Sequence, residues 1–182
     1  SMEDAGMTCL MTFWATARNC WCQKTEIRKF YIFLELINAN LGGFNNSLEL
    51  RFTKAVEDEY VAEIEITARH LQPYGLVHGG VYASIIETLC STGAALTVWG
   101  ENKNMVGLEN HTSFLRAVRG GRLRCTAKPL VLGKRSHVWE ASIHDDKDRL
   151  VASGRVRLMV LEPGAAVAGR EVGLQGQNGS EE

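Results

Sequence analysis

A long apolar stretch, residues 81–99, contains a single charged residue, Glu87, and most constrains how the chain folds. From His70 to Gly100, Glu87 is the only residue among Asp, Glu, Lys and Arg. A stretch this long and apolar forms either a membrane span or a helix buried in a protein core. Because a carboxylate and several Ser and Thr residues interrupt it, we expect a buried helix over residues 78–98.

Segments that alternate apolar and polar residues lie on both sides of this helix, as is typical of half-exposed strands. Residues 48–52 and 62–66 come before it and are joined by a turn at residues 57–59. Helical spacing predicts a further helix over residues 25–40. The strands predicted after the central helix are residues 104–115, 122–132, 138–144 and 150–161. This order predicts an α+β fold, an antiparallel sheet wrapped around a long central helix.

The length of 182 residues is sufficient for one domain with a core. We place that domain at residues 24–162. Residues 1–23 show no clear periodicity and are predicted to be a poorly ordered extension. Residues 163–182 hold five glycines and no aromatic residue, so we predict a flexible tail.

Charge and cysteine content restrict the partners and the compartment. The formal net charge of −1 predicts no binding of nucleic acid or of a membrane surface by the molecule as a whole. Of five cysteines, the only close pair is Cys20 and Cys22, one residue short of a CxxC motif, so we expect no metal site. Glu3 and Asp4 precede an early apolar run where a secretory signal carries positive charge. A reducing, cytoplasmic location fits these features.

The lone carboxylate of Glu87 has two interpretations. A carboxylate buried in an apolar helix is costly without a partner, and such groups cluster at functional sites. Alternatively, Ser84 and Ser91 lie three residues before and four residues after Glu87, so the three form an exposed polar stripe. Spacing alone leaves both interpretations open.

The tripeptide His78-Gly79-Gly80 opens the predicted helix, where the first backbone amides lack intrahelical partners and the helix dipole favours negative charge. Glycine lets a ligand approach the backbone closely, so an amide here can bind a carbonyl oxygen as it becomes an oxyanion. Glu87 lies nine residues beyond His78, about 13 Å along the helix axis. One helix therefore cannot bring both groups to the same carbon atom, and we expect a second chain to complete the site.

These residues belong to longer motifs that resemble the hotdog-fold thioesterases of the PaaI-like group. The motifs are QPYGLVHGG at residues 72–80 followed by Glu87 and Ser91, VGLENHTSFLR at 106–116, KPLVLG at 128–133 and HVWE at 137–140. The resemblance covers about residues 25–162. It is greatest to the glutamate-type branch that contains 4-hydroxybenzoyl-CoA thioesterase and 1,4-dihydroxy-2-naphthoyl-CoA hydrolase.

The resemblance implies an enzyme that hydrolyses an acyl-CoA with an aromatic or medium-sized acyl group and needs no cofactor. It implies that Glu87 is the nucleophile or the general base. The Gly79 amide would polarise the thioester carbonyl with help from His78, Gln72 would orient the reacting groups, and Ser91 would hold the hydrolytic water. The group also favours homodimers that share active sites, assembled into homotetramers.

The phosphates of coenzyme A require Lys or Arg side chains near strand ends. Gly107 leaves room for the pantetheine arm to pass close to a strand. The expected substrate- and CoA-binding residues are Gly80, Val106, Gly107, Leu108, Arg116, Arg119, Lys134, Arg135, Ser136 and His137.

Two other functions remain open. One is an enoyl-thioester hydratase on the same fold, against which the spacing of the HGG tripeptide and Glu87 argues. The other is a non-catalytic acyl-CoA-binding module, which would keep the basic turns without needing Gln72, Glu87 and Ser91 together.

Overall fold

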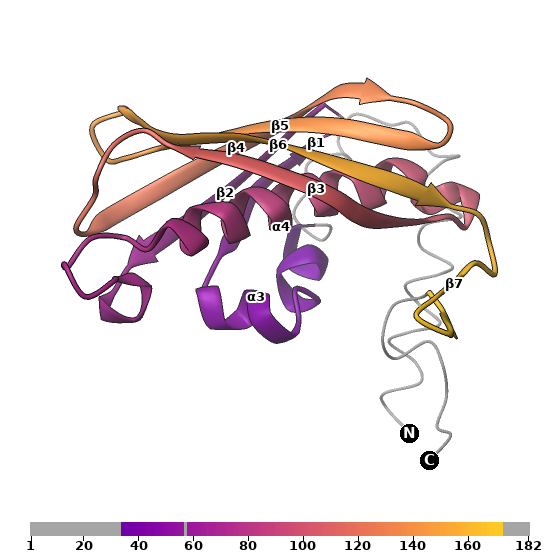
Figure 1. Ribbon diagram of the computed structural model, residues 1–182, viewed down its shortest axis with the longest axis horizontal. Helices are drawn as coiled ribbons and strands as arrows, with labels where there is room; N and C mark the ends of the chain where they lie inside the picture. The colour runs from indigo at the N-terminus through magenta and orange to yellow at the C-terminus, as the bar shows by residue number, and fades with distance from the viewer. Residues whose placement is uncertain (1–33, 57, 173–182) are drawn as a thin grey trace, which may run out of the picture.

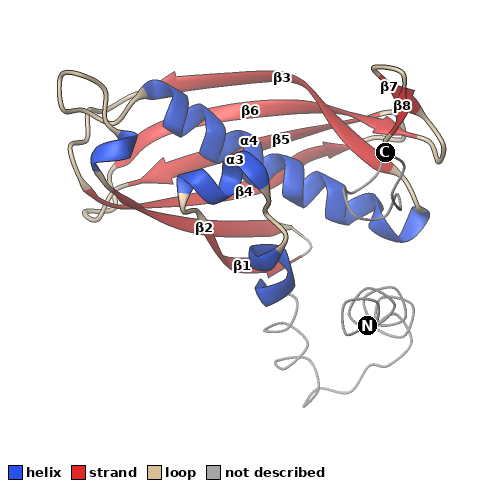
Figure 2. Cartoon of the chain, turned by 90° about the horizontal axis from the view of Figure 1, so that it is seen from below, coloured by secondary structure: helices blue, strands red, loops and turns tan. Residues whose placement is uncertain are grey.

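The computed structural model describes residues 34–56 and 58–172. Six antiparallel strands form one sheet in the order β1-β2-β4-β5-β6-β3, and the long helix α4 lies across one of its faces (Figure 1). The shorter helix α3 lies on the same side as α4 (Figure 2). The elements of this domain are α3 (Gly43–Leu48), β1 (Arg51–Val56), β2 (Glu59–Ile66), the 3-10 helix η1 (Ala68–His70), α4 (Gly79–Val98), the 3-10 helix η2 (Trp99–Glu101), β3 (Asn104–Phe114), β4 (Gly121–Leu132), β5 (Ser136–His144) and β6 (Leu150–Leu161). The predicted α+β fold with a central helix is confirmed.

The differences from the prediction are local. Leu48 ends helix α3 instead of starting a strand, because the left-handed Glu49 that follows separates the helix from β1. Residues 34–39 are helical, whereas the rest of the helix predicted at 25–40 lies outside the described residues except for the turn at residue 40. The predicted N-terminal extension, residues 1–23, also lies outside them.

A small hairpin follows the sheet where the sequence predicts a flexible tail. It consists of β7 (Ala166–Val167) and β8 (Arg170–Glu171), and the Nδ2 atom of Asn104 donates a hydrogen bond of 2.8 Å to the Val172 carbonyl. This contact fastens residue 172 to the start of β3. Strands of two residues are too short to show a periodicity in the sequence.

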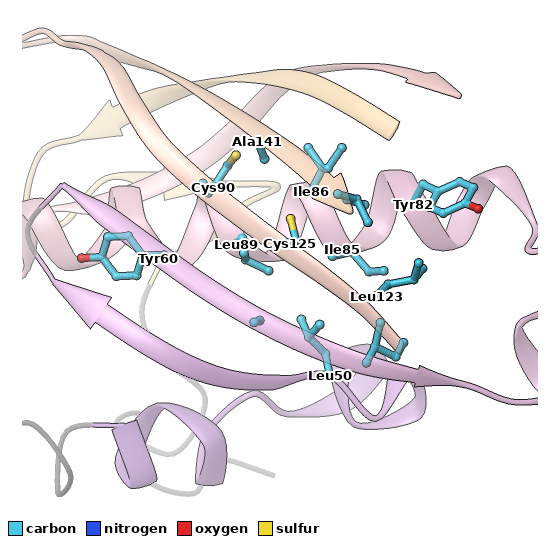
Figure 3. Packing of buried hydrophobic residues seen from close by; sticks show 14 of the residues in the cluster. Leu50, Tyr60, Tyr82, Ile85, Ile86, Leu89, Cys90, Leu123, Cys125 and Ala141 are labelled. Carbon is cyan, nitrogen blue, oxygen red and sulfur yellow. The ribbon is translucent and has the colours of Figure 1, made fainter. Parts of the chain in front are cut away.

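Helix α4 is held against the sheet by its apolar face. Tyr82, Ile85, Ile86, Leu89 and Cys90 are buried on this face and are seen with their neighbours in Figure 3. Burying each large apolar side chain contributes about 1.5–3 kcal/mol. The segment Gly79–Glu101 is long and apolar enough to cross a bilayer, but it is the core helix of this fold.

A close approach of α4 to β5 centres on Gly93 and Trp139. The Trp139 side chain is fully buried, and a Cβ atom on residue 93 would lie 2.6 Å from its ring. Tyr60 packs edge-on against the same indole, with ring centroids 5.7 Å apart. Glycine at residue 93 therefore lets the largest side chain of the core fit beneath the helix.

Cys90 and Cys125 are buried and free. Desolvation by burial raises the pKa of both thiols. Both cysteines therefore act as small apolar core residues. The remaining three cysteines of the sequence lie outside the described residues.

Candidate active site

Glu87 lies on the side of α4 that faces away from the core, and both of its carboxylate oxygens accept hydrogen bonds. The Ser91 hydroxyl donates to Oε1 over 3.1 Å, and the Asn110 side-chain amide donates to Oε2 over 2.8 Å. The carboxyl side chain is half-buried. Glu87 therefore belongs to the predicted polar stripe, and its carboxylate is also fixed by two donors. The two interpretations, a polar stripe and a carboxylate with partners, are compatible.

Gly107 on β3 makes room for this carboxylate. A Cβ atom on residue 107 would lie only 2.7 Å from Oε1 of Glu87. The sequence interpretation placed the pantetheine arm at Val106, Gly107 and Leu108, and the structure adds a different reason for the glycine. Any side chain here would push the carboxylate away from the strand.

A cavity of about 620 Å³ opens in front of Glu87, between α3, α4 and the edge strand β3. It is lined by Phe44, Asn45, Ala83, Ser84, Glu87, Thr88, Ser91, Asn110, Thr112 and Phe114. The Thr88 hydroxyl donates to Oδ1 of Asn45 over 2.7 Å and fastens α3 to α4. Among these lining residues, Glu87 is the one charged side chain. The cavity is therefore lined by one carboxylate and by two phenylalanine rings.

The start of α4 has the form that the sequence predicts. His78 is the N-cap residue, and its Nδ1 atom accepts a hydrogen bond of 2.9 Å from the Gly80 amide. This bond engages the Gly80 amide and leaves the Gly79 amide as the uncapped donor at the helix start. His78 therefore shapes the helix start through its ring. Residue 80 must be glycine for this contact, because a Cβ atom on it would lie 2.9 Å from Nδ1 of His78.

Gly79 and Gln72 line a second, smaller cavity of about 250 Å³, together with Tyr82, Phe114 and Arg116. The Phe114 ring covers Gly79, since a Cβ atom on residue 79 would lie 2.6 Å from it. Phe114 is the residue common to this cavity and to the cavity of Glu87. The chain therefore presents two partial sites, one with Gln72 and Gly79 and one with Glu87 and Ser91.

The predicted phosphate-binding residues divide into two groups. Arg116 and Arg119 lie in the loop after β3, where Nη1 of Arg119 donates to the Tyr74 and Gly75 carbonyls over 3.0 and 3.2 Å. Lys134 and Arg135 are exposed in the turn after β4. Since Arg116 and Arg119 precede β4, the length of this strand separates the two groups by roughly 35 Å at 3.3 Å per residue. One chain therefore does not bring all four cations together.

His137 is a correction to the predicted set, and Ser136 is half-buried beside it. The His137 ring is buried under α4, with Nδ1 3.5 Å from the Thr97 hydroxyl, and desolvation lowers its pKa. It faces the core because it alternates along β5 with the half-buried Ser136 and Val138, which point to the other face of the strand. In this structure the ring is buried instead of lying at the surface where a phosphate would bind.

Several residues of the site could not be recognised in the sequence. Phe44 comes from α3, which the sequence does not predict. Asn110 and Thr112 belong to the motif at residues 106–116, but the sequence assigns neither of them a role. The alternation of residues 110, 112 and 114 along β3 was the available signal, since alternate residues share a strand face. Nothing in the sequence indicated that this face meets Glu87.

Comparison with known proteins identifies the family of the chain. The Thioesterase superfamily matches residues 74–152. The 1,4-dihydroxy-2-naphthoyl-CoA hydrolase of Escherichia coli (strain K12) is 39% identical over 139 residues, which cover 74% of this chain and 99% of that enzyme. A protein of Mycobacterium tuberculosis (strain CDC 1551 / Oshkosh) named as an esterase is 41% identical over 121 residues, which cover 65% of this chain and 86% of that protein.

The solved structures agree as well. A thioesterase from Haemophilus influenzae superposes with a TM-score of 0.67 at 32% identity, over 71% of this chain and 90% of that one. The chain therefore belongs to the thioesterase superfamily and has the hotdog fold that its motifs predict. Its enzyme class is that of a thioester hydrolase.

Proposed function

We propose that the protein hydrolyses the thioester of an acyl-CoA with an aromatic or medium-sized acyl group, giving the free acid and coenzyme A. The observation that carries this proposal is the Glu87 carboxylate, hydrogen-bonded at both oxygens and exposed to a cavity with apolar walls. A carboxylate that is oriented and backed by donors suits either proton abstraction or direct attack.

The two roles of Glu87 lead to the same products. As a general base, Glu87 takes a proton from water as the water oxygen bonds to the thioester carbon. The oxyanion that forms is bound by the Gly79 amide, and it collapses as the C–S bond breaks and the thiolate takes up the proton. As a nucleophile, Glu87 bonds to the carbon and expels the thiolate, and water then hydrolyses the mixed anhydride.

A second copy of the chain is part of the proposal. Along α4, Gly79 and Glu87 are about 12 Å apart by helical rise, and they open into different cavities. Strand β3 forms one edge of the sheet and carries Asn110 beside the Glu87 cavity and Phe114 beside both cavities. Two chains that meet at this edge would place the Glu87 half of one site opposite the Gly79 half of the other. We propose a homodimer with shared sites, assembled into a homotetramer.

The class of acyl group follows from the wall of the Glu87 cavity. Phe44 and Phe114 are exposed by 65% and 57%, so both rings are free to stack on a planar acyl group. The volume falls in the range of pockets for drug-sized ligands. The substrate in the name of the E. coli relative, a naphthoyl-CoA, is of this kind. The buried, free thiols of Cys90 and Cys125 fit the proposed cytoplasmic location.

A panel of CoA thioesters tests the proposal. Purified protein is incubated with benzoyl-, 4-hydroxybenzoyl-, hexanoyl- and acetyl-CoA, and free thiol is measured. We expect release from the aromatic and hexanoyl thioesters and at least about tenfold less from acetyl-CoA, because an acetyl group leaves the apolar wall uncovered. Hydration of crotonyl-CoA without thiol release would favour a hydratase, and tight binding without turnover would favour a non-catalytic module.

A further inference from the structure

The side chain of Asn110 joins β3 to α4 at the catalytic carboxylate. Its Nδ2 atom donates to Oε2 of Glu87 over 2.8 Å and to the Ala83 carbonyl over 3.1 Å. Its Oδ1 atom accepts a hydrogen bond of 2.6 Å from the Thr112 hydroxyl. With Ser91 on Oε1, this forms a chain of donors that runs from Thr112 to Glu87.

The orientation of the Asn110 amide follows from its partners. The Ala83 carbonyl and the Glu87 carboxylate accept but do not donate, so the NH₂ group must face them. The remaining neighbour, the Thr112 hydroxyl, can donate to Oδ1. Exchanging the amide oxygen and nitrogen would put an oxygen against two acceptors, so the network fixes one orientation.

A bulge in β3 makes this contact geometrically accessible. Gly107 and Asn110 are three residues apart and would face opposite sides of a regular strand. The pairing of β3 with β6 shifts between Gly107 and Glu109, so β3 has one extra residue there. This extra residue brings Gly107 and Asn110 to the same face of the strand. Both Gly107 and Asn110 therefore reach Glu87, one by leaving space for Oε1 and the other by binding Oε2.

We propose that Asn110 is a positioning residue for Glu87, oriented by Thr112, and that it holds the carboxylate in one rotamer for hydrolysis. This inference rests on the proposed function. A donor shared between the carboxylate and the helix backbone restricts rotation of the side chain. Ser91 and Asn110 each occupy one oxygen, so a lone pair on each oxygen remains for water or substrate.

The variants Asn110→Ala, Asn110→Asp and Thr112→Val test this role with a substrate that the wild type hydrolyses. For Asn110→Ala we expect kcat to fall about 10- to 100-fold, as for loss of one charge-assisted hydrogen bond, with KM within about threefold. In Asn110→Asp, which keeps the shape of the side chain but has no donor for Oε2 of Glu87, kcat should fall at least as far as in Asn110→Ala. Thr112→Val should show a smaller loss of kcat.

His111→Ala is the matched control, since His111 is the next residue on β3 and lines a cavity with residues such as Ser142 and Ser153 that does not contain Glu87. Its kcat and KM should equal those of the wild type. An Asn110→Ala or Asn110→Asp enzyme with wild-type kcat overturns the inference. A rise in KM as large as the loss of kcat also overturns it, because it would indicate general disruption of the site.

A measurement without turnover separates this inference from the proposed function. Carbon-13 NMR relaxation of the Glu87 side chain, assigned with Glu87→Gln, measures its mobility in the wild type and in Asn110→Ala. The side chain should be more mobile in the variant. Equal mobility refutes the role of Asn110 even if the enzyme hydrolyses acyl-CoA, whereas increased mobility in a protein without thiol release would refute only the hydrolytic function.

Discussion

Replacing Glu87 with glutamine is expected to lower kcat for acyl-CoA hydrolysis at least about a hundredfold, with KM nearly unchanged. Glutamine has the same shape, and its amide oxygen can still accept the Asn110 hydrogen bond, so the fold and substrate binding should persist. What it lacks is the charge and basicity that either role of Glu87 requires. Thiol release at saturating substrate measures kcat, and circular dichroism checks folding.

The control for this prediction is Glu65→Gln, which makes the same chemical change at an exposed site on β2. Glu65 lies 3.6 Å from Arg122 with its side chain 64% exposed, and such a surface pair contributes little. Its kcat should stay within about twofold of the wild type. If Glu87→Gln is as active as Glu65→Gln, Glu87 does not carry the chemistry.

Replacing Trp139 with alanine is expected to lower the free energy of unfolding by about 3–5 kcal/mol. The indole is fully buried between β5 and α4, where Gly93 and Tyr60 pack against it. Alanine leaves a cavity beneath the helix that carries Glu87, and the surrounding close-packed residues cannot fill it. Urea unfolding monitored by circular dichroism gives the difference.

Trp139→Phe serves as the comparison because it keeps an aromatic ring in the core. The Trp139 Nε1 atom has no hydrogen-bond partner among the described residues, so phenylalanine sacrifices no such bond. We expect it to cost less than half of the alanine effect. A Trp139→Ala protein destabilised by less than about 1 kcal/mol would show that this contact does not hold α4 in place.

The fold was predictable because hydrophobic periodicity and one long apolar segment determine its elements. The strand at Leu150–Leu161 has the predicted bounds, and helix α4 starts one residue after the predicted start because His78 acts as its cap. Helix α3 was not predicted because it has only six residues and half of them are Gly or Asn, which favour loops.

The site was predictable only in part. The sequence indicated Glu87, Ser91 and Gly79 because a lone charge and a glycine turn are local signals. The partnership of Glu87 with Asn110 and Gly107 depends on which face of β3 meets α4, and a bulge that no sequence pattern reveals sets that face. Burial of His137 was missed for a related reason, since strand register decides which side chains point inward.

Mixed dimers test most directly the central claim, that Glu87 of one chain and Gly79 of another together hydrolyse one thioester. Glu87→Gln and Gly79→Val chains carry different tags, are co-expressed, and are purified through both tags. Valine at residue 79 would displace the Phe114 ring and cover the amide, so each variant alone should be nearly inactive.

A mixed dimer contains one site with both intact halves and one with both altered, so the account predicts about half of the wild-type kcat per dimer. The measurement is thiol release by the doubly purified protein, with each singly altered homodimer as the blank. Activity of the mixed dimer no greater than that of the two blanks would contradict the shared site.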